Sequence, residues 1–246
     1  MNFSALSNNS LIGKILRQPL RLIPRETPLR VLQGPLMGKR WLAGSHTHGC
    51  WLGSYEAEIQ KRFANEVQAG EVVFDIGANV GFYSLLASVR VGPTGAVYSF
   101  EPLPQNTKLL KKHLQINKIQ NVTVLEVAVS SFETRSRFDD TSGPASGHFS
   151  KKGRLQVQCV SIDFLVSRGR VRPPNCMKID VEGAEAQALS GAEAVLQAYQ
   201  PKIFLSTHGP EARRDCTEIL RGFGYHLEPL TGANGLAGDE FFASAA

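Results

Sequence analysis

The spacing of hydrophobic residues changes near residue 70 and divides the chain into two parts. In the first part, short apolar runs flank a Gly-Pro break, which predicts a β-hairpin, and apolar residues then recur at helical spacing. The expected elements are a strand pair over 29–32 and 39–43, a glycine-rich loop over 46–53 and a helix over 56–67. We therefore expect an N-terminal extension over residues 1–69 and a larger domain over residues 70–246.

Continuous apolar runs alternate with amphipathic segments in the larger domain. Such runs predict strands buried on both faces of a parallel sheet, and the segments between them predict crossover helices. The expected strands are 72–76, 96–100, 122–127, 176–179, 202–206, 225–227 and 240–243, and the expected helices are 82–89, 104–117, 184–198 and 211–222. The pattern predicts an α/β fold with a mostly parallel sheet and helices on both of its faces.

A less regular, polar stretch over residues 130–171 interrupts this alternation. We interpret it as an insertion over the edge of the sheet, with one additional strand over 156–160 and a short helix over 162–167.

Composition narrows the class of protein. Of 246 residues, 42% are hydrophobic and 20% are charged, which excludes a disordered chain, a collagen and a coiled coil. No apolar run is long enough to span a bilayer, and the N-terminus lacks the pattern of a signal peptide. The cysteines form no CxxC pair and predict reduced thiols in a cytoplasmic protein. They are Cys50, Cys159, Cys176 and Cys216.

The net charge of +5 is concentrated in an arm over residues 1–40. The arm carries Lys14, Arg17, Arg21, Arg25, Arg30, Lys39 and Arg40 against Glu26, and the rest of the chain is about neutral. We interpret the arm as a solvated extension, with weak contact to an anionic membrane surface as the alternative. It lacks the interleaved aromatic residues of a single-strand nucleic-acid binder.

A glycine turn follows the first buried strand of the larger domain. Gly77 and Gly81 lie between the strand and a helix whose first N–H groups are free to meet a ligand. Glu101 ends the next strand, where its carboxylate can accept hydrogen bonds from a ribose diol. The combination predicts a site for an adenosine-containing ligand, and the alternative is a tight turn without one.

The spacing of the turn discriminates between such ligands. A dinucleotide site needs G-x-G-x-x-G, whereas this turn is G-x-x-x-G, which argues against a nicotinamide-dependent oxidoreductase. Asp75 would repel a pyrophosphate but suits the sulfonium and ammonium groups of S-adenosyl-L-methionine.

Three segments between residues 70 and 205, taken together and in order, resemble the FkbM family of S-adenosylmethionine-dependent methyltransferases. They are VVFDIGANVGFYSLLAS, VYSFEPLPQNTKLLKKHLQIN and MKIDVEGAEAQALSGAEAVL. The resemblance implies a Rossmann-like seven-stranded methyltransferase sheet with one antiparallel strand. It also implies O-methylation of a hydroxyl group on a small molecule, a sugar or a natural product. A nucleic-acid methyltransferase is the less favoured alternative, because acids over 180–183 stand where a base-gripping Asn-Pro-Pro-aromatic motif is expected.

The resemblance also implies a set of cofactor-binding residues. The turn would hold the methionine end, Glu101 the ribose, and the residues after the second and third strands the adenine. The expected residues are Asp75, Gly77, Ala78, Asn79, Gly81, Phe82, Glu101, Pro102, Leu103, Glu126 and Ala128.

Candidate catalytic residues follow the fourth and fifth strands of the larger domain. An alcohol is a poor nucleophile, so a base should assist methyl transfer. Asp180 is the first candidate, with a helix cap or a salt bridge to Lys178 as the alternative role. His208 is the second, although the family more often has an acid there, which leaves the identity of the base open. These two residues offer no evident third metal ligand, so we expect no metal.

The acceptor side is less constrained by the sequence. Trp51 and Tyr55 precede the larger domain and are candidates for a lid, although Trp51 can equally anchor the extension in the core. Glu182 and His148 are further candidates for contact with the acceptor.

Overall fold

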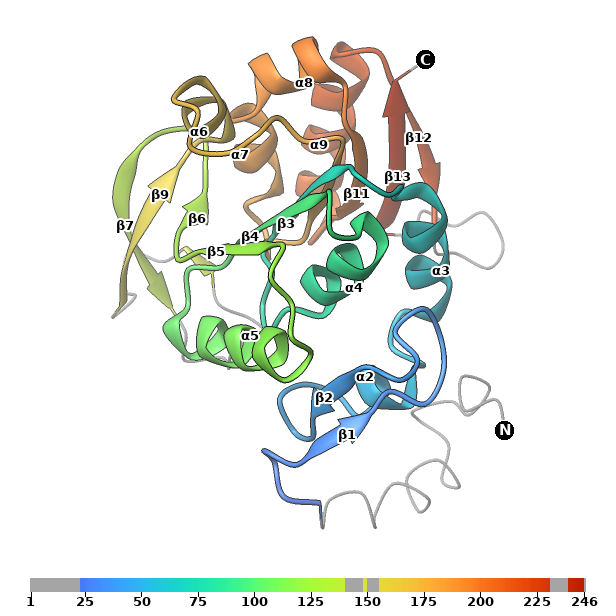
Figure 1. The fold of residues 1–246 in the computed structure, drawn as a ribbon. Helices are drawn as coiled ribbons and strands as arrows, with labels where there is room; N and C mark the ends of the chain where they lie inside the picture. Colours follow the sequence, from blue (N-terminus) through green and yellow to red (C-terminus); the bar gives the residue numbers. More distant parts are fainter. Residues whose placement is uncertain (1–22, 140–147, 150–154, 231–238, 246) are drawn as a thin grey trace.

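Seven strands form the central sheet of the protein (Figure 1). The computed structural model describes residues 23–139, 148–149, 155–230 and 239–245. The strands are β3 (Val72–Ile76), β4 (Ala96–Phe100), β5 (Val122–Leu125), β10 (Cys176–Ile179), β11 (Lys202–Ser206), β12 (Tyr225–Pro229) and β13 (Glu240–Ala245). Their order is β12-β13-β11-β10-β3-β4-β5, and β13 runs antiparallel to both of its neighbours. The predicted α/β fold, with one antiparallel strand in a seven-stranded sheet, is confirmed.

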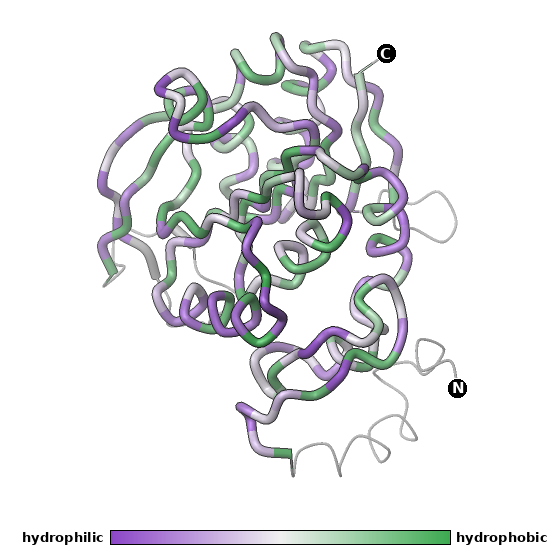
Figure 2. The backbone as a smooth tube through the Cα atoms, viewed as in Figure 1, coloured by the Kyte–Doolittle hydropathy of each residue, from purple (hydrophilic) through white to green (hydrophobic). Residues whose placement is uncertain are grey.

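Helices cover both faces of this sheet. One face carries α3 (Ala57–Glu66) and α4 (Phe82–Val91), with α5 (Pro104–Ile116) beside them near β5. The other face carries α6 (Ile162–Ser167), α7 (Glu185–Ser190), α8 (Glu193–Tyr199) and α9 (Pro210–Gly222). Hydrophobic segments gather in the strands and α4, whereas α5 alternates between apolar and polar residues (Figure 2).

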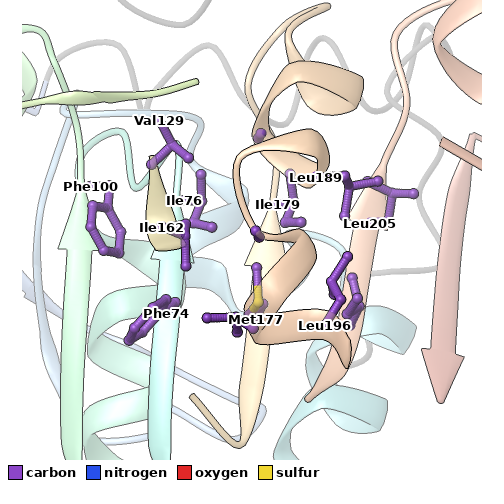
Figure 3. Close-up of a cluster of buried hydrophobic side chains, with 14 of the residues drawn as sticks. Phe74, Ile76, Phe100, Val129, Ile162, Met177, Ile179, Leu189, Leu196 and Leu205 are labelled. Carbon is purple, nitrogen blue, oxygen red and sulfur yellow. The ribbon is translucent and has the colours of Figure 1, made fainter. Parts of the chain in front are cut away.

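The continuous apolar strands have this composition because both faces are buried. Phe74 and Ile76 point to the face covered by α6–α9, where they pack with Met177 and Leu196 (Figure 3). Val73, which precedes Phe74 in the sequence, belongs to the core on the opposite face. Successive side chains of a strand alternate between faces, so every position of β3 is buried, and every one except Asp75 is apolar.

The helix predicted over 184–198 is in fact two helices. The chain turns at Gly191, where an added Cβ would lie 2.0 Å from the carbonyl oxygen of Ser130. The carboxylate of Asp163 then accepts hydrogen bonds from the N–H groups of Ala194 and Val195, at 2.9 and 3.0 Å, and starts α8. This cap comes from a distant helix, so local periodicity does not show the break.

The insertion forms a second sheet over the edge of the first. Its strands are β6 (Ala128–Val129), β7 (Thr134–Asp139), β8 (His148–Phe149) and β9 (Leu155–Val160), in the order β6-β9-β7-β8. The predicted strand over 156–160 and the helix over 162–167 are present. β7 was not expected because its sequence, TRSRFD, is largely polar. The third strand of the main sheet is shorter than predicted, since the chain leaves that sheet at Leu125 and enters the second sheet at Ala128.

The N-terminal segment packs on the main domain. The predicted hairpin is present as β1 (Pro28–Arg30) and β2 (Arg40–Leu42), and the expected loop over 46–53 contains a short helix, α2 (Gly49–Leu52). Trp41 is fully buried and stacks on His113 of α5, with ring centroids 3.8 Å apart. The N–H of Leu42 donates to Nε2 of His113, and Nδ1 of His113 lies 2.8 Å from the carbonyl oxygen of Val80. Residues 23–67 therefore share one hydrophobic core with α4 and the sheet.

Two further sequence expectations concern chemistry rather than fold. All four cysteines are buried and free, as expected. In the described ranges no helix is both long enough and apolar enough to cross a membrane. Lys14, Arg17 and Arg21 of the basic arm lie outside the described residues.

Candidate active site

A cavity opens where β3, β4 and β10 end, and it encloses about 1070 Å³ of space that is partly open to solvent. The ends of parallel strands in an open α/β sheet are where such folds bind small molecules. Its lining combines glycine-turn backbone, buried carboxyl groups, aromatic rings and a short apolar wall. The lining residues are His46, Tyr55, Asp75, Gly77, Ala78, Asn79, Val80, Phe82, Tyr83, Phe100, Glu101, Pro102, Leu103, Asn106, Val127, Ala128, Val129, Lys178, Asp180, Val181, Glu182 and Ala184.

The turn between β3 and α4 forms one wall of this cavity. Gly77 has φ +80°, and an added Cβ would lie 1.9 Å from the carbonyl oxygen of Asp180. Only glycine permits both this backbone conformation and this close approach of two strand ends. The N–H groups of Gly77 and Ala78 both donate to the carbonyl oxygen of Phe100, at 3.0 Å. The turn is thus fixed to both neighbouring strands.

Glu101 follows β4 and faces the cavity from a buried position. Its carboxyl group accepts hydrogen bonds from the N–H of Asn79 at 2.8 Å, the N–H of Leu103 at 2.9 Å and Nδ2 of Asn106 at 3.2 Å. Burial raises the pKa of Glu101 to about 7, although these donors oppose the shift. A buried carboxyl group at a cavity wall is suited to accept hydrogen bonds from a diol.

Asp75 lies deeper and belongs to the framework of the site. It is 3% exposed, and its Oδ2 accepts a hydrogen bond from the hydroxyl of Ser84 at 2.5 Å. Burial raises the pKa of Asp75 to about 6, although the hydrogen bond from Ser84 and the positive charge of Lys178 oppose this shift. The residue lines the cavity and also ties β3 to α4.

The apolar wall of the cavity is formed by Pro102, Leu103 and residues 127–129. The predicted adenine neighbours Pro102, Leu103 and Ala128 therefore lie together. Glu126 does not line the cavity: its side chain is about half exposed and pairs with Lys111 at 2.5 Å. This position does not support the predicted contact between Glu126 and adenine.

Asp180 follows β10 and presents its carboxylate to the cavity. Its Oδ2 lies 3.3 Å from Nζ of Lys178, which is the salt bridge anticipated from the sequence. Lys178 is 1% exposed and also donates to the hydroxyl of Ser206 at 2.6 Å. Nζ of Lys178 also lies 5.3 Å from the ring centre of Tyr83. Asp180 is therefore paired with a buried cation.

His208 follows β11 and is surrounded by carboxylates. Its Nδ1 lies 2.6 Å from Oε1 of Glu185, and its Nε2 lies 3.7 Å from Asp180 and 3.6 Å from Glu182. The hydrogen bond to Glu185 raises the pKa of His208 to about 9. The imidazole is thus positively charged at neutral pH, and this arrangement argues against the predicted role of His208 as a base. His208 does not line the cavity itself.

The remaining predicted residues are divided between cavity and core. Tyr55, Phe82 and Glu182 line the cavity, whereas Gly81 precedes α4 without lining the cavity. Trp51 is packed in the core, where its Nε1 donates to Nδ1 of His48. The side chain of His148 lies outside the described residues.

The predicted site residues did not include four polar residues that line the cavity: His46, Tyr83, Asn106 and Lys178. A lysine within the otherwise apolar strand CMKI was the one local signal, because a charged residue in a buried strand needs a partner. Among the residues that the structure describes, no cluster of His, Cys, Asp and Glu is arranged to hold a metal ion.

Comparison with known proteins agrees with this geometry. The model of the methyltransferase FkbM domain family matches residues 75–227. The hexuronic acid methyltransferase AglP of Haloferax volcanii is 27% identical over 167 residues, which cover 67% of each chain. The 31-O-demethyl-FK506 methyltransferase FkbM of Streptomyces tacrolimicus is 23% identical over 198 residues, which cover 67% of this chain and 76% of the relative.

Among solved structures, the FkbM methyltransferase of Methylobacillus flagellatus matches with a TM-score of 0.52 and 17% identity. The match covers 81% of this chain and 55% of that one, so this chain spans about half of that protein. At this identity the likeness shows a shared fold. Since the family model covers more than half of the sequence, the chain belongs to the FkbM family of S-adenosylmethionine-dependent methyltransferases.

Proposed function

We propose that this protein transfers the methyl group of S-adenosylmethionine to a hydroxyl oxygen of a small molecule, a sugar or a natural product. The observation that carries the proposal is the cavity where three strands end. It brings together a glycine turn, the buried carboxyl group of Glu101 and the carboxylate of Asp180. The names of the two relatives above, a hexuronic acid methyltransferase and a demethyl-FK506 methyltransferase, support acceptors of this class.

The residues of the cavity fit the cofactor. Glu101 would accept hydrogen bonds from the ribose hydroxyls, and the wall containing Leu103 and Ala128 would pack against the adenine. Residues 77–80 of the turn and the buried carboxyl group of Asp75 would hold the methionine end. Burial raises the pKa of Asp75, so its carboxyl group would ionise more readily with a cationic ligand beside it. The ionised carboxylate would then complement the positive charge of the cofactor. When bound, S-adenosylmethionine supplies an electrophilic methyl group on a positively charged sulfur.

Asp180 would orient the acceptor. Its carboxylate lines the cavity with Glu182. One carboxylate oxygen of Asp180 pairs with Lys178, and the other lies near Nε2 of His208. Two cationic groups fix the carboxylate in place, so an acceptor hydroxyl that donates to Asp180 meets a preorganised partner. Tyr55 and Tyr83 also line the cavity, and their aromatic rings would limit the access of water to the acceptor.

The test is methyl transfer by the purified protein with isotope-labelled S-adenosylmethionine and a panel of acceptors. The panel contains glucuronic acid, its methyl glycoside, a neutral hexose glycoside and a polyhydroxylated macrolide. We expect a methyl ether on a hydroxyl oxygen, identified by mass spectrometry and NMR. A methyl ester, an N-methyl product or a failure of S-adenosylhomocysteine to bind in calorimetry would contradict the proposal.

Asp180→Asn serves as the matched active-site variant. It keeps the size of the side chain but removes the charge between Lys178 and His208. We expect turnover to fall while the affinity for S-adenosylhomocysteine changes little, because Asp180 is assigned to the acceptor.

A further inference from the structure

The segment before the family domain supplies part of the cavity. His46 and Tyr55 both line it, yet they precede residue 75, where the match to the family model begins. They reach the cavity because the hairpin and α3 pack against α4 in one core. The side of the cavity formed by this segment therefore carries chemistry that the family motifs do not specify.

The ring of His46 is held in a defined orientation. Its Nδ1 lies 3.7 Å from the sulfur of Cys50, and its plane meets the ring of Tyr55 edge-on, with centroids 5.3 Å apart. Cys50 is fully buried at the start of α2, so it fixes the Nδ1 side of the ring. In the described part of the chain no hydrogen bond uses Nε2 of His46, which leaves this nitrogen for a ligand in the cavity.

The charge state of His46 differs from that of His208. Burial lowers the pKa of His46, although the negative charges of Glu56 and Asp180 oppose this shift. The other neighbours of the ring, Cys50 and Tyr55, are uncharged at neutral pH because burial raises the pKa of each. His46 is therefore a neutral imidazole at neutral pH and is able to accept a proton, whereas His208 already carries one.

We propose that Nε2 of His46 is the general base that takes the proton from the acceptor hydroxyl. This inference rests on the proposed function. The proton of the imidazole is then on Nδ1 and points to the sulfur of Cys50, so that Nε2 carries the lone pair. Asp180 lines the same cavity but has Lys178 and His208 at its two oxygens, which suits it to hold the hydroxyl in place.

The acceptor oxygen forms a bond to the methyl carbon while the bond from that carbon to sulfur breaks, and its electron pair stays on sulfur. The hydroxyl proton passes to Nε2 of His46, which becomes an imidazolium close to Asp180 and Glu56. The proton returns to solvent when the product leaves. The two carboxylates that oppose the lowering of the pKa of His46 thus stabilise the charge formed in the step.

The first experiment compares His46→Gln with His48→Gln. His48 lies two residues further along the same loop, is absent from the cavity lining and accepts a hydrogen bond from Trp51, so it is a matched control. For His46→Gln we expect kcat to fall by about 10²- to 10⁴-fold, with unchanged affinity for S-adenosylhomocysteine in calorimetry. His48→Gln should retain the activity of the parent. Full activity of a folded His46→Gln variant would overturn the proposal.

The second experiment needs no variant of the base. Nitrogen-15 NMR of the wild-type histidines reports both the tautomer and the pKa of each ring. We expect His46 to carry its proton on Nδ1 and to titrate below its ordinary value of 6.5. A ring protonated on Nε2, or one that titrates above pH 7, would refute the assignment without any measurement of turnover.

The two experiments separate this inference from the function on which it depends. If the wild-type protein methylates no hydroxyl acceptor, the proposed function fails and the inference fails with it. If the wild-type protein is active and His46→Gln is equally active, only the assignment of the base fails. The acidic limb of the wild-type pH–rate profile should reflect the pKa of His46 measured by NMR, and a disagreement would also contradict the proposal.

Discussion

Binding of the cofactor should release a proton from Glu101. In the free protein, burial raises the pKa of this carboxyl group from 4.5 to about 7, so ionising it costs about 3 kcal/mol more than in water. Two ribose hydroxyls that donate to the carboxylate favour its ionised form. At about pH 6.5 the free protein holds roughly 0.8 of a proton on Glu101, and at about pH 8 roughly 0.1. Binding should therefore release most of a proton at the lower pH and little at the higher pH.

Calorimetry measures this release directly. S-adenosylhomocysteine is titrated into the protein in two buffers of different ionisation enthalpy at each pH, and the difference in heat gives the number of protons. Asp75 has a pKa of about 6 and adds a smaller contribution, which the comparison of variants removes. In Glu101→Gln the release at the lower pH should fall to the contribution of Asp75.

The same variant should bind the cofactor more weakly. The amide introduced by Glu101→Gln keeps one acceptor oxygen, but its NH₂ group faces the N–H of Asn79 or Leu103, which are donors themselves. Loss of a hydrogen bond to a charged group costs about 1.5–3 kcal/mol, which corresponds to a Kd roughly 10- to 150-fold higher. Glu126→Gln is the control, since Glu126 is exposed and paired with Lys111 outside the cavity. Equal proton release by Glu101→Gln and the parent would refute the ribose assignment.

Two further predictions concern stability. Gly77→Ala should lower the free energy of unfolding by more than the roughly 1–3 kcal/mol expected for strained backbone alone, because its Cβ meets the carbonyl oxygen of Asp180. Gly183→Ala has a similar positive φ with open space around it and should cost only the backbone term; equal losses in urea unfolding would contradict this explanation. The pKa of His208 is raised from 6.5 to about 9 by Glu185, so the folded state binds this proton more tightly. The contribution of this proton to the free energy of unfolding should be complete below pH 6.5 and should be lost as the pH rises through about 9. The His208→Gln variant should lack this pH dependence in thermal unfolding.

Local patterns were sufficient for the strands of the main sheet, and they identified most of the lining residues that we propose for the cofactor. Continuous apolar runs, the glycine turn and Glu101 are all visible within short segments, and the parallel topology brings the strand ends together. The polar strand β7 carries no such pattern, because it lies in a small sheet at the edge. Glu126 does not line the cavity for a related reason: the chain changes sheets after Leu125, and this side chain lies half exposed and paired with Lys111.

The acceptor side depends on contacts between distant residues. His46 reaches the cavity only because the N-terminal segment packs against α4, and its spacing in the sequence does not show this. The structure argues against the predicted role of His208 as a base because Glu185, which is fully buried at the start of α7, raises the pKa of the imidazole and keeps it protonated. Pairing of this kind is set by the packing of α7 against α9 rather than by either segment alone.

His113 links the N-terminal segment, which we propose faces the acceptor, to the glycine turn, which we propose holds the cofactor. One ring nitrogen accepts the N–H of Leu42 in the hairpin, and the other donates to the carbonyl oxygen of Val80 in the glycine turn. Burial lowers the pKa of His113 to about 4, so the neutral ring that can satisfy both partners is the form present at physiological pH. An N-terminal segment transplanted from a relative to change the acceptor would have to bring a compatible α5 with it. In this protein, acceptor choice and the shape of the cofactor turn are therefore expected to evolve together.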